Sequence, residues 1–142
     1  MATVSTYALN CAPAELGGNY PRVLEYFLDV AETGTITQND IYQMLQGVGD
    51  IAVLAGGYEI ITPFSASTTI EVGIAGGTEI STAITATAAA GTKGAFTFTA
   101  NCVLFADDDT VDAQVTGASP TVGKIRFWFL VADVSRNHGA TE

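Results

Sequence analysis

The sequence is dominated by short stretches of alternating residue character, and the clearest is KIRFWFLVA at residues 124–132. Successive side chains of a β-strand point to opposite faces of its sheet, so this stretch sorts into two rows. One row is wholly apolar and consists of Ile125, Phe127, Phe129 and Val131. The other row consists of Lys124, Arg126, Trp128, Leu130 and Ala132. The apolar row has to be buried, which predicts a sheet with a packed core on that side.

Seven further stretches have the same character, being rich in Thr, Val, Ile and Phe and separated by Gly, Pro, Asn and Asp. The predicted strands are residues 22–30, 40–46, 51–55, 58–64, 68–74, 94–106, 110–116 and 124–134. Helix signals are nearly absent, and the Ala-rich residues 81–91 are predicted to be a loop between sheets because their Thr residues disfavour a helix. About eight evenly spaced strands predict an all-β fold, an antiparallel jelly-roll-like β-sandwich.

The first twenty residues differ from the rest, because they have no consistent period and contain Pro13, Gly17 and Gly18 ahead of Pro21. We therefore predict an extended N-terminal arm over residues 1–20 and a single β-sandwich domain over residues 21–142. Such an arm can lie across a neighbouring subunit in an oligomer.

The last two predicted strands suggest a hairpin closed by GASPTVG at residues 117–123. If residues whose numbers add up to 240 lie opposite each other, Val115 faces Ile125, Ala113 faces Phe127 and Val111 faces Phe129. A slip of one residue would mix the two faces, so alternation strongly specifies this register. The same register places Asp112 opposite Trp128 and diagonal to Arg126, which predicts an ion pair within the hairpin.

The charge balance limits the partners of the chain. Five Lys and Arg residues stand against 15 Asp and Glu residues, giving a formal net charge of −10. Because phosphate repels such a chain, we predict no direct nucleic-acid partner. No stretch reaches the ~18 apolar residues of a membrane span, and the N-terminus lacks the pattern of a signal peptide. We therefore predict no membrane partner and synthesis in a cytoplasm.

The residues that could carry chemistry have plainer explanations. The only histidine, His138, lies in a polar tail, which is a poor place for a catalytic base. The acidic stretch ADDDTVD at residues 106–112 lacks the ligand spacing of a calcium loop and is typical of a turn between strands. Scattered carboxylates such as Glu25, Asp29, Glu59 and Glu71 alternate with apolar residues, as outward strand positions do. We predict no catalytic residue, no metal and no cofactor, so the chain is not expected to be an enzyme.

The polar row of residues 124–132 is the strongest candidate for a contact surface. Trp and Arg are enriched at interface hot spots, and Trp128 shares its row with Arg126 and Leu130. We predict that Trp128 and Leu130 meet another subunit or the second sheet, and that Tyr7 and Tyr20 of the arm add contacts. The alternative is that Trp128 lies flat on the surface beneath the Arg126 guanidinium.

Three blocks of the sequence resemble the head decoration, or cement, proteins of tailed phages. These blocks, within residues 22–134, are YFLDVAETGTITQNDIYQML, AGGYEIITPFSASTTIEVGIAGG and DDDTVDAQVTGASPTVGKIRFWFLVADV. The resemblance implies a jelly-roll-like structural protein that docks on the outside of an assembled capsid as dimers or trimers.

The resemblance predicts a structural virion protein that self-associates and cements the shell by binding the major capsid protein. The expected location is the capsid exterior, after synthesis in the host cytoplasm. The alternative is a carbohydrate-binding or host-adhesion module of a fibre, a tail or a cell surface, because jelly rolls serve that role as well. It would require an exposed aromatic platform in a groove.

Overall fold

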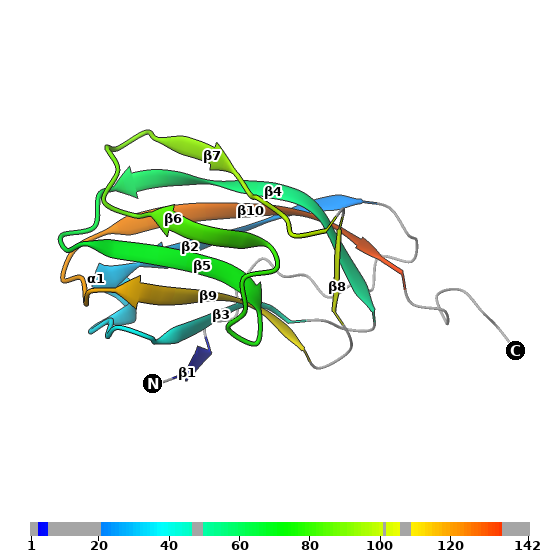
Figure 1. Cartoon of the computed structure of the whole chain (residues 1–142), viewed down its shortest axis with the longest axis horizontal. Helices are drawn as coiled ribbons and strands as arrows, with labels where there is room; N and C mark the ends of the chain where they lie inside the picture. Colours follow the sequence, from blue (N-terminus) through cyan, green and yellow to red (C-terminus); the bar gives the residue numbers. More distant parts are fainter. Residues whose placement is uncertain (1–2, 6–20, 47–49, 101, 106–108, 135–142) are drawn as a thin grey trace, which may run out of the picture.

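The computed structural model describes residues 3–5, 21–46, 50–100, 102–105 and 109–134, which form two β-sheets in a sandwich (Figure 1). Sheet A has the strand order β1 (Thr3–Ser5), β3 (Ile41–Gln46), β9 (Thr110–Gly117), β5 (Thr68–Ile74) and β6 (Ser81–Thr85). Sheet B has the order β2 (Arg22–Asp29), β10 (Lys124–Asp133), β4 (Ile51–Thr62) and β7 (Lys93–Ala95), and β8 (Val103–Phe105) also pairs with β4. All pairings are antiparallel except that of β1 with β3. The predicted all-β sandwich is therefore confirmed.

The core lies between the sheets and is filled by the inward rows of their strands. Ile125, Phe127 and Phe129 of β10 are completely buried, as the alternation predicts. Val111, Ala113 and Val115 of β9 are equally buried on the other side of the core. Phe96 packs beside the Phe129 ring, with 5.3 Å between the ring centroids.

Several predicted boundaries are wrong where glycine or threonine obscured the pattern. The predicted strands 51–55 and 58–64 are one continuous strand, β4, which runs through Gly56 and Gly57. The predicted loop 81–91 begins with strand β6. The predicted strand 94–106 is divided between β7 and β8, and the described residues between them are not in a strand.

The predicted hairpin of the last two long strands is wrong. β9 pairs with β3 and β5 in sheet A, whereas β10 pairs with β2 and β4 in sheet B. The connection crosses between the sheets, and hydrogen bonds from the Ala118 and Ser65 amides to the Ser67 and Val122 carbonyls link it to the loop after β4. Its ends, Gly117 and Gly123, have φ values of 86° and 152°. The apolar rows of β9 and β10 thus lie on opposite sides of the core, so Asp112 and Arg126 are not paired.

The predicted arm and the predicted domain boundary at residue 21 are described only in part. Residues 3–5 form β1, which pairs in parallel with β3 at the edge of sheet A. Residues 6–20, with Tyr7 and Tyr20, lie outside the described residues. The helix α1 (Val30–Thr33) directly follows β2 and is capped by Asp29, whose side chain accepts a hydrogen bond from the Ala31 amide.

Candidate interaction face on sheet B

The outward row of β10 lies in the middle of sheet B, between β2 and β4. Because the register is antiparallel on both sides, each outward residue of β10 has one neighbour from each flanking strand. Trp128 lies between Glu25 and Gly57, Leu130 between Val23 and Ala55, and Arg126 between Phe27 and Glu59. Strand β8 extends the same face. Ala132, in the outward row of β10, pairs with Ala52 of β4, and Ala52 pairs with Leu104 of β8. We call this surface the sheet B face.

Arg126 is the electrostatic centre of the sheet B face. Its Nη2 lies 2.8 Å from Oε2 of Glu59 on β4, and its Nη1 lies 4.0 Å from Oε2 of Glu25 on β2. Nζ of Lys93 on β7 lies 3.7 Å from Oε1 of Glu59. These pairs join four strands of sheet B, and each exposed pair contributes about 0.2–1 kcal/mol at most.

Trp128 is partly exposed and packs along the surface of the sheet. Its ring lies beneath the Arg126 guanidinium, whose carbon is 5.4 Å from the ring centroid. On β4 the ring passes over Gly57, where an added Cβ would lie 2.6 Å from Cζ2 of Trp128. Of the two contacts predicted for Trp128, the one with the second sheet is wrong, because Trp128 belongs to the outward row of β10, and the one with another subunit stays a prediction. The cation–π arrangement predicted as the alternative is present, and it leaves part of the ring accessible.

Lys124 neutralises one acidic group at the end of the same row. Its Nζ lies 3.0 Å from Oδ2 of Asp29 and 5.3 Å from the centroid of the Phe27 ring. Burial by itself raises the pKa of Asp29, but the hydrogen bonds from Lys124 and from the Ala31 amide outweigh it, so the pKa is lowered. Asp29 is therefore charged at neutral pH.

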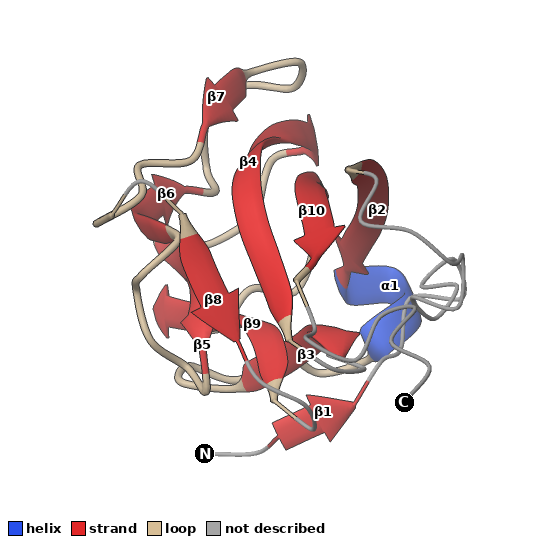
Figure 2. Ribbon diagram, turned by 90° about the vertical axis from the view of Figure 1, so that its right-hand side faces the viewer, coloured by secondary structure: helices blue, strands red, loops and turns tan. Residues whose placement is uncertain are grey.

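Exposed apolar side chains distinguish sheet B, in which Figure 2 shows β10 between β4 and β2, from sheet A. Val23 is 65% exposed, Leu104 is 63% exposed and Phe27 is 43% exposed, and all three belong to the sheet B face. No large apolar side chain is exposed on β3, β5, β6 or β9 of sheet A. Four of the five Lys and Arg residues also lie on strands of sheet B: Arg22, Lys93, Lys124 and Arg126.

The structure thus brings Arg126, Trp128 and Leu130 together on one face, while Tyr7 and Tyr20 lie outside the described residues. It adds Val23, Phe27 and Leu104, which the sequence did not single out. Val23 and Phe27 share their row of residues 22–29 with Glu25 and Asp29, which the alternation already indicated as outward, so the same two-residue period could have identified them. The predicted role of these residues in partner contact remains a prediction.

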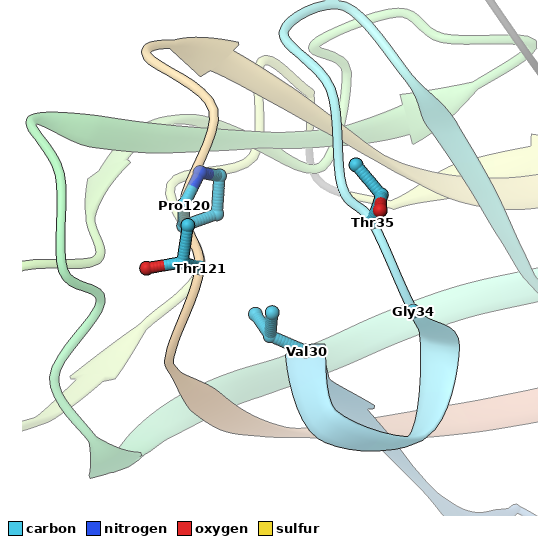
Figure 3. A pocket seen from close by; sticks show the side chains of 5 residues that line it. All are labelled: Val30, Gly34, Thr35, Pro120 and Thr121. Carbon is cyan, nitrogen blue, oxygen red and sulfur yellow. The ribbon is translucent and has the colours of Figure 1, made fainter.

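A surface cavity of about 320 Å³ lies elsewhere, between α1 and the loop that precedes β10 (Figure 3). It is lined by Val30, Gly34, Thr35, Pro120 and Thr121, and none of these residues is charged or aromatic. Among residues 3–5, 21–46, 50–100, 102–105 and 109–134, no three His, Cys, Asp or Glu side chains are grouped to hold a metal ion. The described helix is also too short to cross a membrane.

Solved structures of phage capsids contain chains with this fold. A chain from the capsid of Ralstonia phage GP4 has a TM-score of 0.68 at 14% identity, and the match covers 94% of this chain and 99% of that chain. A chain from the cyanophage Pam1 capsid asymmetric unit has a TM-score of 0.59 at 26% identity, covering 89% and 94%. A chain from the acidic stable capsid of Helicobacter pylori bacteriophage KHP30 has a TM-score of 0.51 at 14% identity, covering 80% and 93%. No protein-family model and no curated protein sequence matches the chain.

Proposed function

We propose that this chain is a structural protein of a phage virion, that it binds the outside of the capsid and that it self-associates there. The virion role is supported by the 26% identity to a chain of the cyanophage Pam1 capsid, which extends over nearly the full length of both chains. The fold shared with the capsid chains of two other phages agrees with it. Catalysis is not part of this proposal, and the major capsid protein is the proposed partner.

The observation that carries the binding half of the proposal is the asymmetry between the two sheets. The sheet B face combines partly exposed Trp128 and Leu130 with exposed Val23, Phe27 and Leu104. An apolar patch with Trp and Arg at its centre and charged pairs at its side is the composition of a protein–protein interface. Strands β5 and β9 of sheet A instead present Thr, Gln and Glu side chains, as a solvent-facing surface does.

The proposed cementing action follows from selective binding. A protein that binds the assembled shell but not its dissociated subunits stabilises the shell by mass action. Because many copies bind one particle, a weak contact per copy is sufficient, especially if neighbouring copies also bind each other. Strand β2 is an edge strand of sheet B, and such a strand can pair with a second copy of the chain. It has eight residues and carries exposed Val23 and Phe27, whereas the other described edge strands have three to five residues.

The alternative role, a carbohydrate-binding module, has no specific support in the described residues. Sugar stacking would need an open aromatic platform in a groove. The Trp128 ring instead lies beneath the Arg126 guanidinium, and the described cavity has no aromatic lining. We therefore retain the virion role.

The test is reconstitution on particles stripped of this protein. We expect the wild-type chain to rebind and to restore resistance to heat and low salt, and Val23→Lys to bind at least about tenfold more weakly, a loss of ~1.4 kcal/mol. The matched control is Thr82→Lys, which adds the same charge at an exposed position of sheet A. If stripped particles resist heat and low salt equally well without the protein, the cementing role is wrong. If Val23→Lys and Thr82→Lys bind equally well, the sheet B face does not contact the capsid.

A further inference from the structure

A buried carboxylate, Asp112 of β9, lies on the outward side of sheet A. Its neighbours in the register are Gln43 of β3 and Gly73 of β5. Although it faces away from the core, Asp112 is only 2% exposed. The cover comes from the turn after β5, because an added Cβ on Gly73 would collide with the backbone of Gly77. The absence of a side chain at Gly73 therefore lets the chain fold back over the sheet.

The turn at residues 74–77 is tight and is tied to Asp112. The Gly77 amide donates to the Ile74 carbonyl over 2.9 Å, and Ala75 and Gly76 have φ values of 52° and 79°. Two consecutive positive φ values are characteristic of a type I′ turn. The Gly76 amide donates a hydrogen bond to Oδ2 of Asp112 over 3.1 Å. One carboxylate oxygen therefore attaches the turn to sheet A.

The second carboxylate oxygen has no such partner. Oδ1 of Asp112 is buried and makes no hydrogen bond. Among the described residues, the charged groups placed near it are acidic: Asp109 directly precedes β9, Glu71 of β5 lies on the same face of sheet A, and Glu79 contacts the turn. Strands β3, β5, β6 and β9 contain no Lys or Arg. Burial raises the pKa of Asp112, and Asp109 adds to this effect, while the Thr110 hydroxyl and the Gly76 amide oppose it.

We propose that Asp112 is a proton-controlled latch, which holds the turn at residues 74–77 against sheet A when it is protonated and releases the turn when it ionises. A neutral carboxyl group can still accept from the Gly76 amide through one oxygen. An ionised group leaves a buried negative oxygen without a donor, which costs free energy until water reaches it. Lifting the turn admits that water, so the open state gains population as the pH rises.

Opening of the turn would change the surface of sheet A beside the latch. An added Cβ on Gly76 would lie 2.9 Å from Cδ1 of Ile41, so the turn rests directly on this side chain. Ile41 is 9% exposed in the closed arrangement. Its outward position in β3, next to Gln114, means that release of the turn exposes an apolar side chain on a polar face.

Amide hydrogen exchange of Gly76, measured by NMR from pH 4 to pH 8 and corrected for the intrinsic exchange rate, tests the latch. We expect the opening constant to rise by up to about tenfold per pH unit over the range in which Asp112 titrates, because one proton is linked to opening. The carboxyl ¹³C shift of Asp112 in the wild-type chain should titrate over the same range, and this measurement needs no variant.

Asp112→Asn should keep Gly76 protected at every pH, because a neutral amide group replaces the carboxylate. Glu71→Gln is the matched control, since it removes an acidic group from the same face but keeps the Asp112 carboxylate, so the slope of the pH dependence should remain and at most shift to lower pH. Protection of Gly76 that is independent of pH in the wild-type chain, or unchanged pH dependence in Asp112→Asn, would overturn the latch. Neither result bears on binding of the sheet B face to a capsid.

Discussion

Two adjacent glycines of β4 set the placement of aromatic rings on both sides of sheet B. An added Cβ on Gly56 would lie 2.8 Å from Cε2 of Phe96, which packs in the core beside Phe129. On the opposite side, Gly57 lies beneath Trp128. Neither glycine has a positive φ, so the missing side chain matters here for the close approach of the rings and not for the backbone conformation.

Replacing Gly57 with Ala should displace the Trp128 ring. The new Cβ would lie 2.5 Å from the Gly94 carbonyl oxygen and 2.6 Å from Cζ2 of Trp128, so we expect a loss of about 1–3 kcal/mol in the free energy of unfolding. Urea unfolding followed by tryptophan fluorescence measures both the loss and the change around the ring. Ala55→Ser, two positions away on the exposed side of the same strand, should change stability by less than about 0.5 kcal/mol. Equal effects of the two substitutions would show that Trp128 does not pack on β4.

Among the elements, β10 is the organising strand because it is flanked on both sides along most of its length. Its inward row fills the core, while its outward row collects ion pairs from β2 and β4. Alternation identified both rows correctly, and the residues predicted to be buried are buried. The neighbour of β10 was predicted wrongly, because strands that share a sheet and strands that face each other across a core have the same alternation.

Double-mutant cycles distinguish the observed pairing from the predicted hairpin. Arg126→Met combined with Glu59→Gln should show a coupling energy of about 0.5–1 kcal/mol, because the two side chains are in contact and only partly exposed. Arg126→Met combined with Asp112→Asn should be additive to within ~0.3–0.5 kcal/mol, because the outward sides of the two sheets are separated by the core. Thermal or urea unfolding supplies all the values. If Arg126 is coupled to Asp112 but not to Glu59, the predicted hairpin of residues 110–116 and 124–134 is correct and the observed pairing is wrong.

On the scale of the whole molecule, the two outer surfaces are chemically different. Sheet B carries exposed apolar side chains and four of the five basic residues, whereas the outward sides of β5 and β9 in sheet A carry acidic and uncharged polar residues. The net charge of −10 keeps such a molecule soluble while one face stays apolar. Because Lys124 and Arg126 are paired with Asp29 and Glu59, an apolar partner surface fits sheet B better than a polyanion does.

The single tryptophan makes the orientation of the bound protein measurable. Trp128 lies on the sheet B face and is partly exposed in the free chain. If this face contacts the capsid, binding should lower the acrylamide quenching constant of Trp128 roughly two-fold or more, because interface aromatics lose contact with solvent. Stripped particles without the protein provide the background. Unchanged quenching in the bound state would mean that another surface makes the contact.

The sequence by itself determined the all-β class, the inward and outward rows of most strands and the position of Arg126, Trp128 and Leu130 on one face. These properties follow from the two-residue period of a strand, which is local. Only the tertiary structure decided that β9 and β10 lie in different sheets, that β4 passes through Gly56 and Gly57, and that Asp112 is buried beneath a turn. Each of these depends on contacts between residues far apart in the chain, and alternation contains no information about which distant strand provides the contact.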